Sequence, residues 1–380
     1  MKIKGEDYKD SFNNIINIKE FSGSSPPEIF VGRWNYPDVY AGILSPQKQG
    51  NTEIFSSPKI WNKNKVPIQS IINLRNKLIY GRLKINVKKP KNKIIPAMQE
   101  IALAYKPVST EFKLKGPIKL NEERETKVPI IPKASEVERI RLQENPKIKR
   151  EVEYITNDIS LKATEALIEL EKAGIDNYSM TRLLSAGLIG TAKNRKMVPT
   201  RWSITAVDNI LSKEKIKKIR LYPKINEIMV FNGEYLGNHY EFILLPEKWG
   251  FEVIEISSSN KEYWHDYEIF FGRKDYAKDV TGAYYANRLA LTEYLEKIKR
   301  QCLCIIFREI RPEYNAPLGV GILREITREA FMHESEKFNN ISDALKRIQE
   351  RLITPIENFT EKSVFLKNYK KQKKLTEFLK

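Results

Sequence analysis

Short apolar runs in the second half of the chain, separated by glycine and proline residues, constrain its fold most. The runs cover residues 227–231, 240–245, 251–256 and 266–271, and the residues that separate them include Gly233, Gly237, Pro246 and Gly250. Segments this short between such breakers predict β-strands joined by tight turns, because a crossover helix needs a longer connection. We therefore expect an antiparallel meander in this region.

Helical spacing of apolar residues is found on both sides of these runs. Alanine and leucine recur at intervals of three and four over 163–173, and Gly174 follows as a C-terminal cap. Other helices are expected over 68–79, 179–188, 203–220, 283–301, 321–331 and 342–352, and other strands over 83–87 and 302–307. Ser203 is the expected N-cap of its helix. The predicted fold class is α+β, with a mostly antiparallel mixed sheet flanked by helices.

A length of 380 residues suits two domains, or one domain with large appendages. Residues 1–60 contain many glycine, serine and proline residues, and residues 113–150 contain four prolines among many charges. We therefore expect residues 1–150 to form an irregular or α+β N-terminal region with a basic segment at 82–119, in which apolar side chains such as Trp34 and Tyr36 can be buried. We expect the main α+β domain over 151–355. Residues 356–380 are expected to form a flexible basic tail.

Positive charge is concentrated in a few windows of the chain. The whole sequence has 66 Lys+Arg, 48 Asp+Glu and a net charge of +18. Residues 82–119 and 191–224 each have a net charge of +8, and residues 361–380 have +5, so the remainder is slightly acidic. Clustered cations favour a polyanionic partner, because phosphate contacts release counterions. A lysine-rich surface with solvated charge is the alternative; a membrane surface is less favoured, because no window combines its lysines with a broad apolar face.

Several classes of protein are excluded by composition. No run approaches roughly 18 uncharged apolar residues, so no membrane span is expected, and the charged residues 1–7 do not resemble a signal peptide. Cys302 and Cys304 are the only cysteines, which excludes a disulfide scaffold and a four-cysteine zinc site. We interpret both as core thiols and expect no zinc. The expected location is cytoplasmic, in association with the nucleoid.

Residues 372–380 carry a short docking motif. Gln372, Leu375, Phe378 and Leu379 fit the pattern Gln-x-x-aliphatic-x-x-aromatic-bulky. A spacing of three suits a 3₁₀ turn, which places the apolar side chains together as a plug beside the glutamine. The pattern resembles the motif by which replication and repair proteins dock on the sliding clamp PCNA. An amphipathic helix that packs on its own domain is the alternative.

A basic loop precedes the helix expected over 203–220. Arg195, Lys196 and Arg201 are candidate phosphate contacts, and Trp202 is a candidate platform for base stacking. For Trp202 alone, a core position is the preferred interpretation because of its size. Further candidate DNA-binding residues are Arg33, Lys88, Lys89 and Lys91.

Two carboxylates lie on one face of the strand expected over 266–271. Asp266 and Glu268 have the spacing that could hold Mg²⁺ or Mn²⁺, as a metal-dependent nuclease requires. Arg273 is then the candidate that steadies the scissile phosphate, and Asp208 is a further candidate catalytic carboxylate. Solvent-facing acids on an antiparallel strand are commonplace, and that interpretation is preferred. No other cofactor is indicated.

Several stretches, in order along the chain, resemble the archaeal Nre family of DNA-repair proteins. They lie at residues 21–33, 36–37, 184–188, 198–208, 276–277, 282–286, 308–309 and 317–320, and the most specific begins Val198-Pro199-Thr200-Arg201-Trp202. The resemblance implies a role in DNA-damage repair alongside nucleotide-excision repair proteins, with clamp docking through the C-terminal motif. Many members begin with a Cys-rich, zinc-finger-like segment. This sequence has no cysteine before Cys302, so zinc binding is not carried over.

The leading hypothesis is therefore a DNA-repair factor that binds DNA through clustered Lys and Arg side chains and docks on the clamp. A metal-dependent repair nuclease is the alternative. An RNA-binding protein fits the charge but not the clamp motif.

Overall fold

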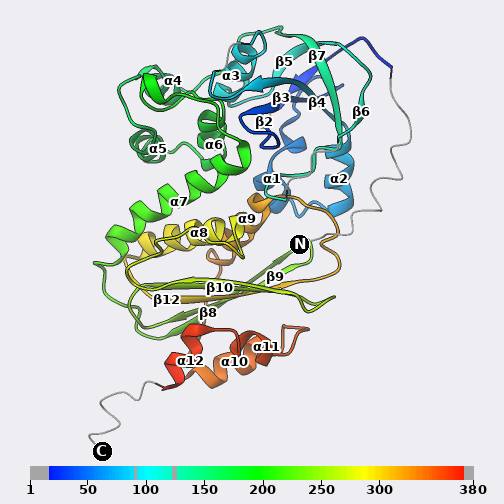
Figure 1. Ribbon diagram of the computed structural model, residues 1–380. Coiled ribbons are helices and arrows are strands. Elements are labelled where there is room, and N and C mark those ends of the chain that lie inside the picture. The colour runs from blue at the N-terminus through cyan, green and yellow to red at the C-terminus, as the bar shows by residue number, and fades with distance from the viewer. Residues whose placement is uncertain (1–16, 90–91, 122–125, 372–380) are drawn as a thin grey trace, which may run out of the picture. The chain divides into compact units, whose positions relative to one another are not determined.

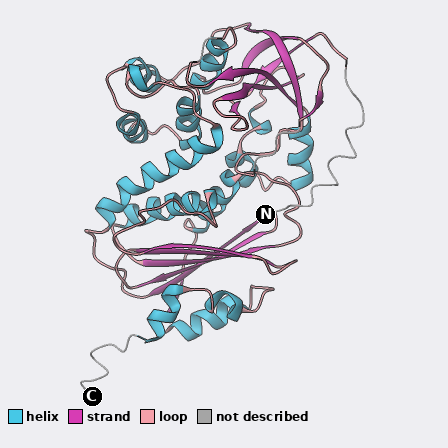
Figure 2. Ribbon diagram, viewed as in Figure 1, coloured by secondary structure: helices cyan, strands magenta, loops and turns pink. Residues whose placement is uncertain are grey.

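The computed structural model describes residues 17–89, 92–121 and 126–371 (Figure 1). It forms two compact units: unit 1 comprises Met1–Leu211 and Asn315–Ile322, and unit 2 comprises Ser212–Tyr314 and Leu323–Lys380. Each contains both strands and helices, which confirms the α+β class (Figure 2). We expected the main domain to begin at residue 151. Residues 151–211 cluster instead with unit 1, because Ala186 and Met197 belong to the apolar core of its sheet.

Unit 1 is built on a seven-stranded sheet. Its strands are β1 (Glu20–Ser25), β2 (Ile29–Val31), β3 (Asp38–Pro46), β4 (Leu78–Asn86), β5 (Val108–Leu114), β6 (Lys119–Leu120) and β7 (Lys133–Leu142). They are ordered β1-β5-β7-β4-β3-β2, with β6 paired to β7, and only β4 and β7 pair in parallel. The sheet curves until Ser24 N–H, in β1, donates to Lys48 O just after β3 at 2.8 Å. Residues 20–46, predicted as irregular, are thus largely strand.

The helices of unit 1 pack on this sheet and on one another. They are α1 (Pro58–Lys63), α2 (Ile68–Asn76), α3 (Ile95–Leu103), α4 (Arg150–Asn157), α5 (Ala163–Lys172) and α6 (Asn177–Ser185), followed by the start of α7 (Thr200–Ile219). Short 3₁₀ helices span Glu53–Phe55 and Ala192–Asn194. Gly174 ends α5 with φ +74°, as predicted. Ser203 is not an N-cap: α7 begins three residues earlier, because Pro199 O accepts the first-turn N–H groups of Trp202 and Ser203.

Unit 2 is built on a six-stranded sheet. Its strands are β8 (Ile228–Tyr235), β9 (Asn238–Leu245), β10 (Gly250–Ser257), β11 (Tyr263–Glu268), β12 (Leu303–Ile310) and β13 (Glu336–Phe338), ordered β11-β10-β12-β9-β8-β13. The predicted meander is wrong at one point. β8–β9 and β10–β11 are antiparallel hairpins, but β12 lies between them, parallel to β10. Its central position matches its sequence, because residues 303–307 are an unbroken apolar run and both faces of the strand are buried. Cys304, near its start, is fully buried, as expected.

Helices cover both faces of this sheet. In unit 2, α8 (Gly282–Ile298) and most of α9 (Val320–Ala330) lie on one face, and α10 (Ile341–Gln349), α11 (Ile356–Thr360) and α12 (Val364–Lys371) lie on the other (Figure 1). Ile356, Phe359 and Leu366 share an apolar core with the strands. The segment predicted as a flexible tail is therefore helical and packed as far as the structure describes it. Over its described residues, the chain has no helix with the length and apolarity needed to cross a membrane.

Candidate nucleic-acid interface

Three large aromatic side chains of unit 1 are exposed near one another in the fold. Trp34 and Tyr36 lie in the turn between β2 and β3, and Trp202 lies in the first turn of α7. The ring centroids of Tyr36 and Trp202 are 5.1 Å apart with the planes tilted by 54°. The exposed fractions are 49% for Trp34, 43% for Tyr36 and 44% for Trp202. The preferred sequence interpretations, which placed these three side chains in the core, are therefore wrong.

Backbone hydrogen bonds hold this turn in place. Gly32 N–H donates to Tyr40 O at 2.8 Å, which closes the β2–β3 hairpin, and Val87 N–H donates to Pro37 O at 3.0 Å from the end of β4. At the base of the turn, Val31 N–H donates to Thr200 Oγ1 at 2.9 Å. The hairpin is thus joined directly to the start of α7, which explains why residues so distant in sequence meet as a ring pair.

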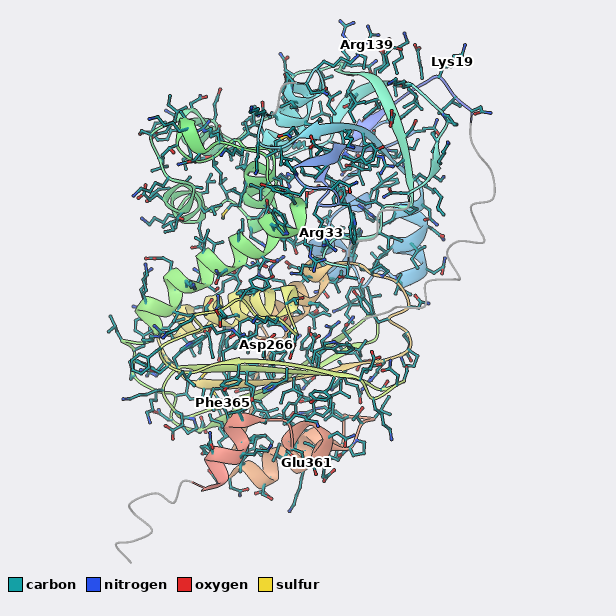
Figure 3. All side chains as sticks on the ribbon, viewed as in Figure 1. Lys19, Arg33, Arg139, Asp266, Glu361 and Phe365 are labelled. Atoms are coloured by element: carbon teal, nitrogen blue, oxygen red, sulfur yellow. The ribbon has the colours of Figure 1, made fainter. Side chains whose placement is uncertain are left out.

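Cationic side chains accompany the three rings. The guanidinium of Arg33, which is labelled in Figure 3, lies 4.3 Å from the Trp34 ring centroid, and Lys88 Nζ lies 5.5 Å from that of Tyr36. Lys196 is exposed in the loop before α7. We call these six residues, Arg33, Trp34, Tyr36, Lys88, Lys196 and Trp202, the aromatic–cationic surface.

The other predicted DNA-binding residues have different surroundings. Lys89 is exposed next to Lys88, and Arg201 is half-buried in the first turn of α7. Lys91 and the clamp motif, Gln372, Leu375, Phe378 and Leu379, lie outside the described residues.

Arg195 braces the loop instead of presenting its charge outward. Its Nε, Nη1 and Nη2 donate to the carbonyl oxygens of Gly190, Thr156 and Asp158, each at 2.8 Å. Burial lowers the pKa of this guanidinium, and the nearby Asp158 carboxylate acts against that shift. We therefore treat Arg195 as a positioning residue.

A cavity opens beside the aromatic–cationic surface. Its volume is about 400 Å³, and its lining includes Tyr36, Lys162, Leu184, Asn194, Met197 and Trp202. The loop of residues 186–199 forms one wall, and within it Asn194 Nδ2 donates to Thr191 Oγ1 at 2.9 Å. Asn194 and Thr191 could not be identified as site residues from the sequence, because a polar pair in a basic loop has no distinctive spacing.

Nearby acids offset part of the positive charge in the second half of the 191–224 window. In unit 2, Lys215 and Lys218 both pair with Glu296 at 2.7 Å, and Lys224 pairs with Glu247 at 2.9 Å. Burial would raise the pKa of Glu296, but the two lysines outweigh it, and this pKa lies below its usual range. Net charge in the sequence therefore overstates the positive potential of this segment.

The predicted metal ligands of β11 are buried. Asp266, labelled in Figure 3, accepts the backbone N–H groups of Asp279 at 3.0 Å and Val280 at 2.8 Å, and pairs with Arg273 at 2.9 Å. Glu268 pairs with the buried Arg288 at 2.7 Å and accepts Trp249 Nε1–H at 3.2 Å. The expectation of solvent-facing acids is wrong, because arginines and backbone N–H groups compensate both carboxylates inside the unit.

The remaining catalytic candidate also lies inside the fold. Asp208 belongs to unit 1, is fully buried, and has Asn177 Nδ2 at 3.5 Å. Among the described residues, no group of three or more His, Cys, Asp or Glu side chains is arranged to hold a metal ion. The three carboxylates are thus buried and have protein partners where an open metal position would be needed.

Comparison with known proteins agrees with the resemblance noted in the sequence. The family model described as "Archaeal Nre, N-terminal" matches residues 3–264, and "Archaeal Nre, C-terminal" matches 268–378. The first match ends and the second begins within β11, inside the six-stranded sheet of unit 2, so their boundary does not coincide with that of the compact units. No solved structure matches the chain.

Relatives of the chain cover most of its length. DNA repair protein NreB of Archaeoglobus fulgidus is 33% identical over 95% of this chain and 92% of its own length. DNA repair protein NreA of the same organism is 37% identical over 86% of this chain and 84% of its own. DNA repair protein NreA of Haloferax volcanii is 30% identical over 94% and 89%. Both family models and all three relatives lead to one assignment: the chain belongs to the archaeal Nre family.

Proposed function

We propose that this protein acts in DNA repair and binds DNA at the aromatic–cationic surface of unit 1. The ring pair of Tyr36 and Trp202 carries the proposal. Two solvent-exposed aromatic rings in contact cost free energy unless a partner covers them, and bases stack on such rings whatever their sequence. Membership of a family whose relatives are named DNA repair proteins supports DNA as the partner.

The cations around the rings suit the same partner. Lys88 and Lys196 are exposed: Lys88 Nζ lies 5.5 Å from the Tyr36 ring centroid, and Lys196 lines the cavity together with Tyr36 and Trp202. Both side chains can contact the phosphates that flank a stacked base. Stacking needs a base face that is not already covered in a duplex. The surface therefore favours single-stranded or distorted DNA over regular B-form DNA.

The experiment measures affinity for a single-stranded oligonucleotide over a range of salt concentrations. Tyr36→Ala and Trp202→Ala should each weaken binding by about 1–3 kcal/mol, the contribution of one stacked base. Tyr154→Ala removes a more exposed aromatic ring on α4 and serves as the matched control, with unchanged affinity expected. Equal losses in all three variants would contradict the assignment.

Charge is tested separately. Lys88→Gln and Lys196→Gln should each reduce the slope of log K against log salt by about 0.7, whereas Lys172→Gln, at the far end of α5, should leave it unchanged. An affinity of the unsubstituted protein that does not fall with added salt would overturn the electrostatic part of the proposal.

We further propose docking on the sliding clamp through Gln372, Leu375, Phe378 and Leu379, on the strength of their sequence pattern. The double variant Leu375→Ala/Phe378→Ala should lose retention on immobilised clamp, and Thr376→Ala, which changes a variable position of the motif, should keep it. Retention of the double variant would refute this role. The partnership with nucleotide-excision repair proteins has its support in the family resemblance alone.

A further inference from the structure

The cavity beside the ring pair has the size of a small-ligand site. Its volume of about 400 Å³ is at the lower end of the range of roughly 300–1,000 Å³ that such sites occupy. The side chains that line it come from the β2–β3 turn, the start of α5, the end of α6 and the loop before α7, all within unit 1. A duplex cannot enter a space of this size, but one base can.

The walls of the cavity differ in chemistry in a way that suits a nucleobase. Leu184, Met197 and the rings of Tyr36 and Trp202 supply apolar surface for a planar ring. Asn194 supplies an amide, and its Nδ2 donates to Thr191 Oγ1 at 2.9 Å, which fixes the orientation of the amide group. An oriented asparagine is one of the side chains that hydrogen-bonds to base edges.

The loop that carries Asn194 is held rigidly. Arg195 anchors it through three backbone carbonyl oxygens, and Val198 N–H donates to Ser185 O at 3.1 Å. Asn194 N–H and Arg195 N–H both donate to Thr191 O, at 2.8 Å and 3.0 Å. A wall fixed in this way has little conformational entropy to lose when a ligand binds.

From this arrangement we propose that the cavity captures one unstacked base of a DNA strand. One ring of the Tyr36–Trp202 pair stacks on the base, and the other ring, tilted by 54°, contacts the edge of the base. Asn194 hydrogen-bonds to the base edge, and Lys196 contacts the phosphate. The proposal rests on the DNA-binding function proposed above and adds the kind of DNA position that the protein selects. Extrusion of a base from a duplex requires the loss of its pairing and stacking, and that loss is smallest at a mismatched or damaged position. The cavity therefore makes the protein selective for such positions.

The test compares two duplexes of equal length at one salt concentration, one fully matched and one with a single central mismatch. The unsubstituted protein should bind the mismatched duplex about tenfold more tightly, equivalent to about 1.4 kcal/mol. Asn194→Ala removes the amide, and Ala163→Met adds volume at the cavity wall. Both variants should lose the preference and keep their affinity for the matched duplex, and melting curves will confirm that they fold.

The position of the captured base is tested by crosslinking. A 5-iodouracil at the mismatched position, irradiated in the complex, should crosslink to Tyr36, Met197 or Trp202. Crosslinks only to residues outside the cavity would overturn the proposal. So would calorimetric binding of free dTMP with an affinity equal to that of the mismatched duplex, since the cavity would then be a site for free nucleotides.

The two proposals fail in different ways. If Tyr36→Ala and Trp202→Ala leave all DNA affinities unchanged, the DNA-binding function proposed for this surface is wrong. If they weaken binding but the mismatched duplex has no advantage over the matched one, the surface binds DNA and only base capture is wrong.

Discussion

Val31 N–H donates a hydrogen bond of 2.9 Å to Thr200 Oγ1, and this contact joins the β2–β3 hairpin to the first residue of α7. Val31 is buried, so its N–H has no access to water once the partner is lost. The bond therefore fixes the relative positions of Tyr36 and Trp202, although the two side chains carrying the rings are well away from the bond itself.

Thr200→Val should consequently lower the free energy of unfolding by about 1–3 kcal/mol, the cost of an unsatisfied buried donor. It should also weaken binding of single-stranded DNA, although residue 200 carries no ring or charge. Thr200→Ser retains the acceptor and should preserve most of both properties. Denaturant unfolding and anisotropy titrations measure the two effects, and a Ser variant as impaired as the Val variant would contradict this explanation.

The loop before α7 depends on a glycine for two separate reasons. Gly187 has φ +70°, and a Cβ there would lie 2.9 Å from the carbonyl carbon of Lys196. Gly174 has a similar φ of +74° but has no atom within 4 Å of a built Cβ. Gly174→Ala should cost about 1 kcal/mol of stability for the backbone conformation alone. Gly187→Ala should cost about 1–3 kcal/mol more, because of overpacking against the loop. Equal melting temperatures for the two variants would show that the loop yields freely.

The buried pair of Glu268 and Arg288 should respond asymmetrically to substitution. Arg288→Met leaves a buried carboxylate without its guanidinium and should cost about 3–5 kcal/mol in the free energy of unfolding. Glu268→Gln/Arg288→Met removes both charges and should recover part of that loss. A double variant less stable than the single one would contradict a pairing role for Glu268.

The same strand gives a test of the nuclease alternative. If Asp266 only accepts its backbone hydrogen bonds and pairs with Arg273, Mg²⁺ or Mn²⁺ should not raise the melting temperature of the protein. The purified protein should then not cleave DNA in the presence of either ion. Metal-dependent cleavage that is lost in Asp266→Asn, with folding intact, would establish the nuclease.

His239 couples the stability of unit 2 to pH. Burial acts to lower the pKa of this imidazole, but its hydrogen bonds with Glu241 and Glu234 outweigh burial and raise the pKa above its usual range. Arg311 acts against the rise, and Arg351 also pairs with Glu241, through both carboxylate oxygens. Because the pKa of His239 is higher in the folded than in the unfolded state, its protonation stabilises the fold. This stabilisation is fully present at pH values below the unfolded-state pKa of about 6.5, and it is lost as the pH rises through the folded-state pKa.

His239→Gln should therefore cost more stability at about pH 6 than at about pH 9. Denaturant unfolding of the native and variant proteins across that pH range measures the difference between their free energies of unfolding. The contributions of the other titrating groups largely cancel in this difference. A loss independent of pH would show that the imidazole contributes by packing alone.

Local signals in the sequence identified α2 and α5 to α10, whereas α1, α3, α4, α11 and α12 were not predicted. The apolar spacing over 163–173 and the glycine after it identified α5 and its cap, because both depend on neighbours within a few residues. Strand order was not accessible in the same way. β12 lies between β9 and β10, and no pattern within β9 or β10 shows that these two strands do not pair with each other.

Burial of individual side chains depends on the same long-range contacts. Trp202 was expected inside because of its size, but its position is set by the hairpin joined through Val31. Asp266 and Glu268 were expected outside because they are charged. They lie inside because Arg273 and the distant Arg288 compensate them. Some residues of the aromatic–cationic surface could therefore be predicted individually from the sequence. Their assembly into one site could not be predicted.

The insertion of β12 also has a consequence for the order in which the protein is made. On the ribosome, the β8–β9 and β10–β11 hairpins emerge well before β12, and until Leu303–Ile310 follow they have no strand to join them. During that interval β9 and β10 each present an unpaired edge, a recognised risk for association between nascent chains. The centre of the unit 2 sheet is therefore incomplete during most of its synthesis. It is completed only when β12 and the strand and helices that follow it have been made.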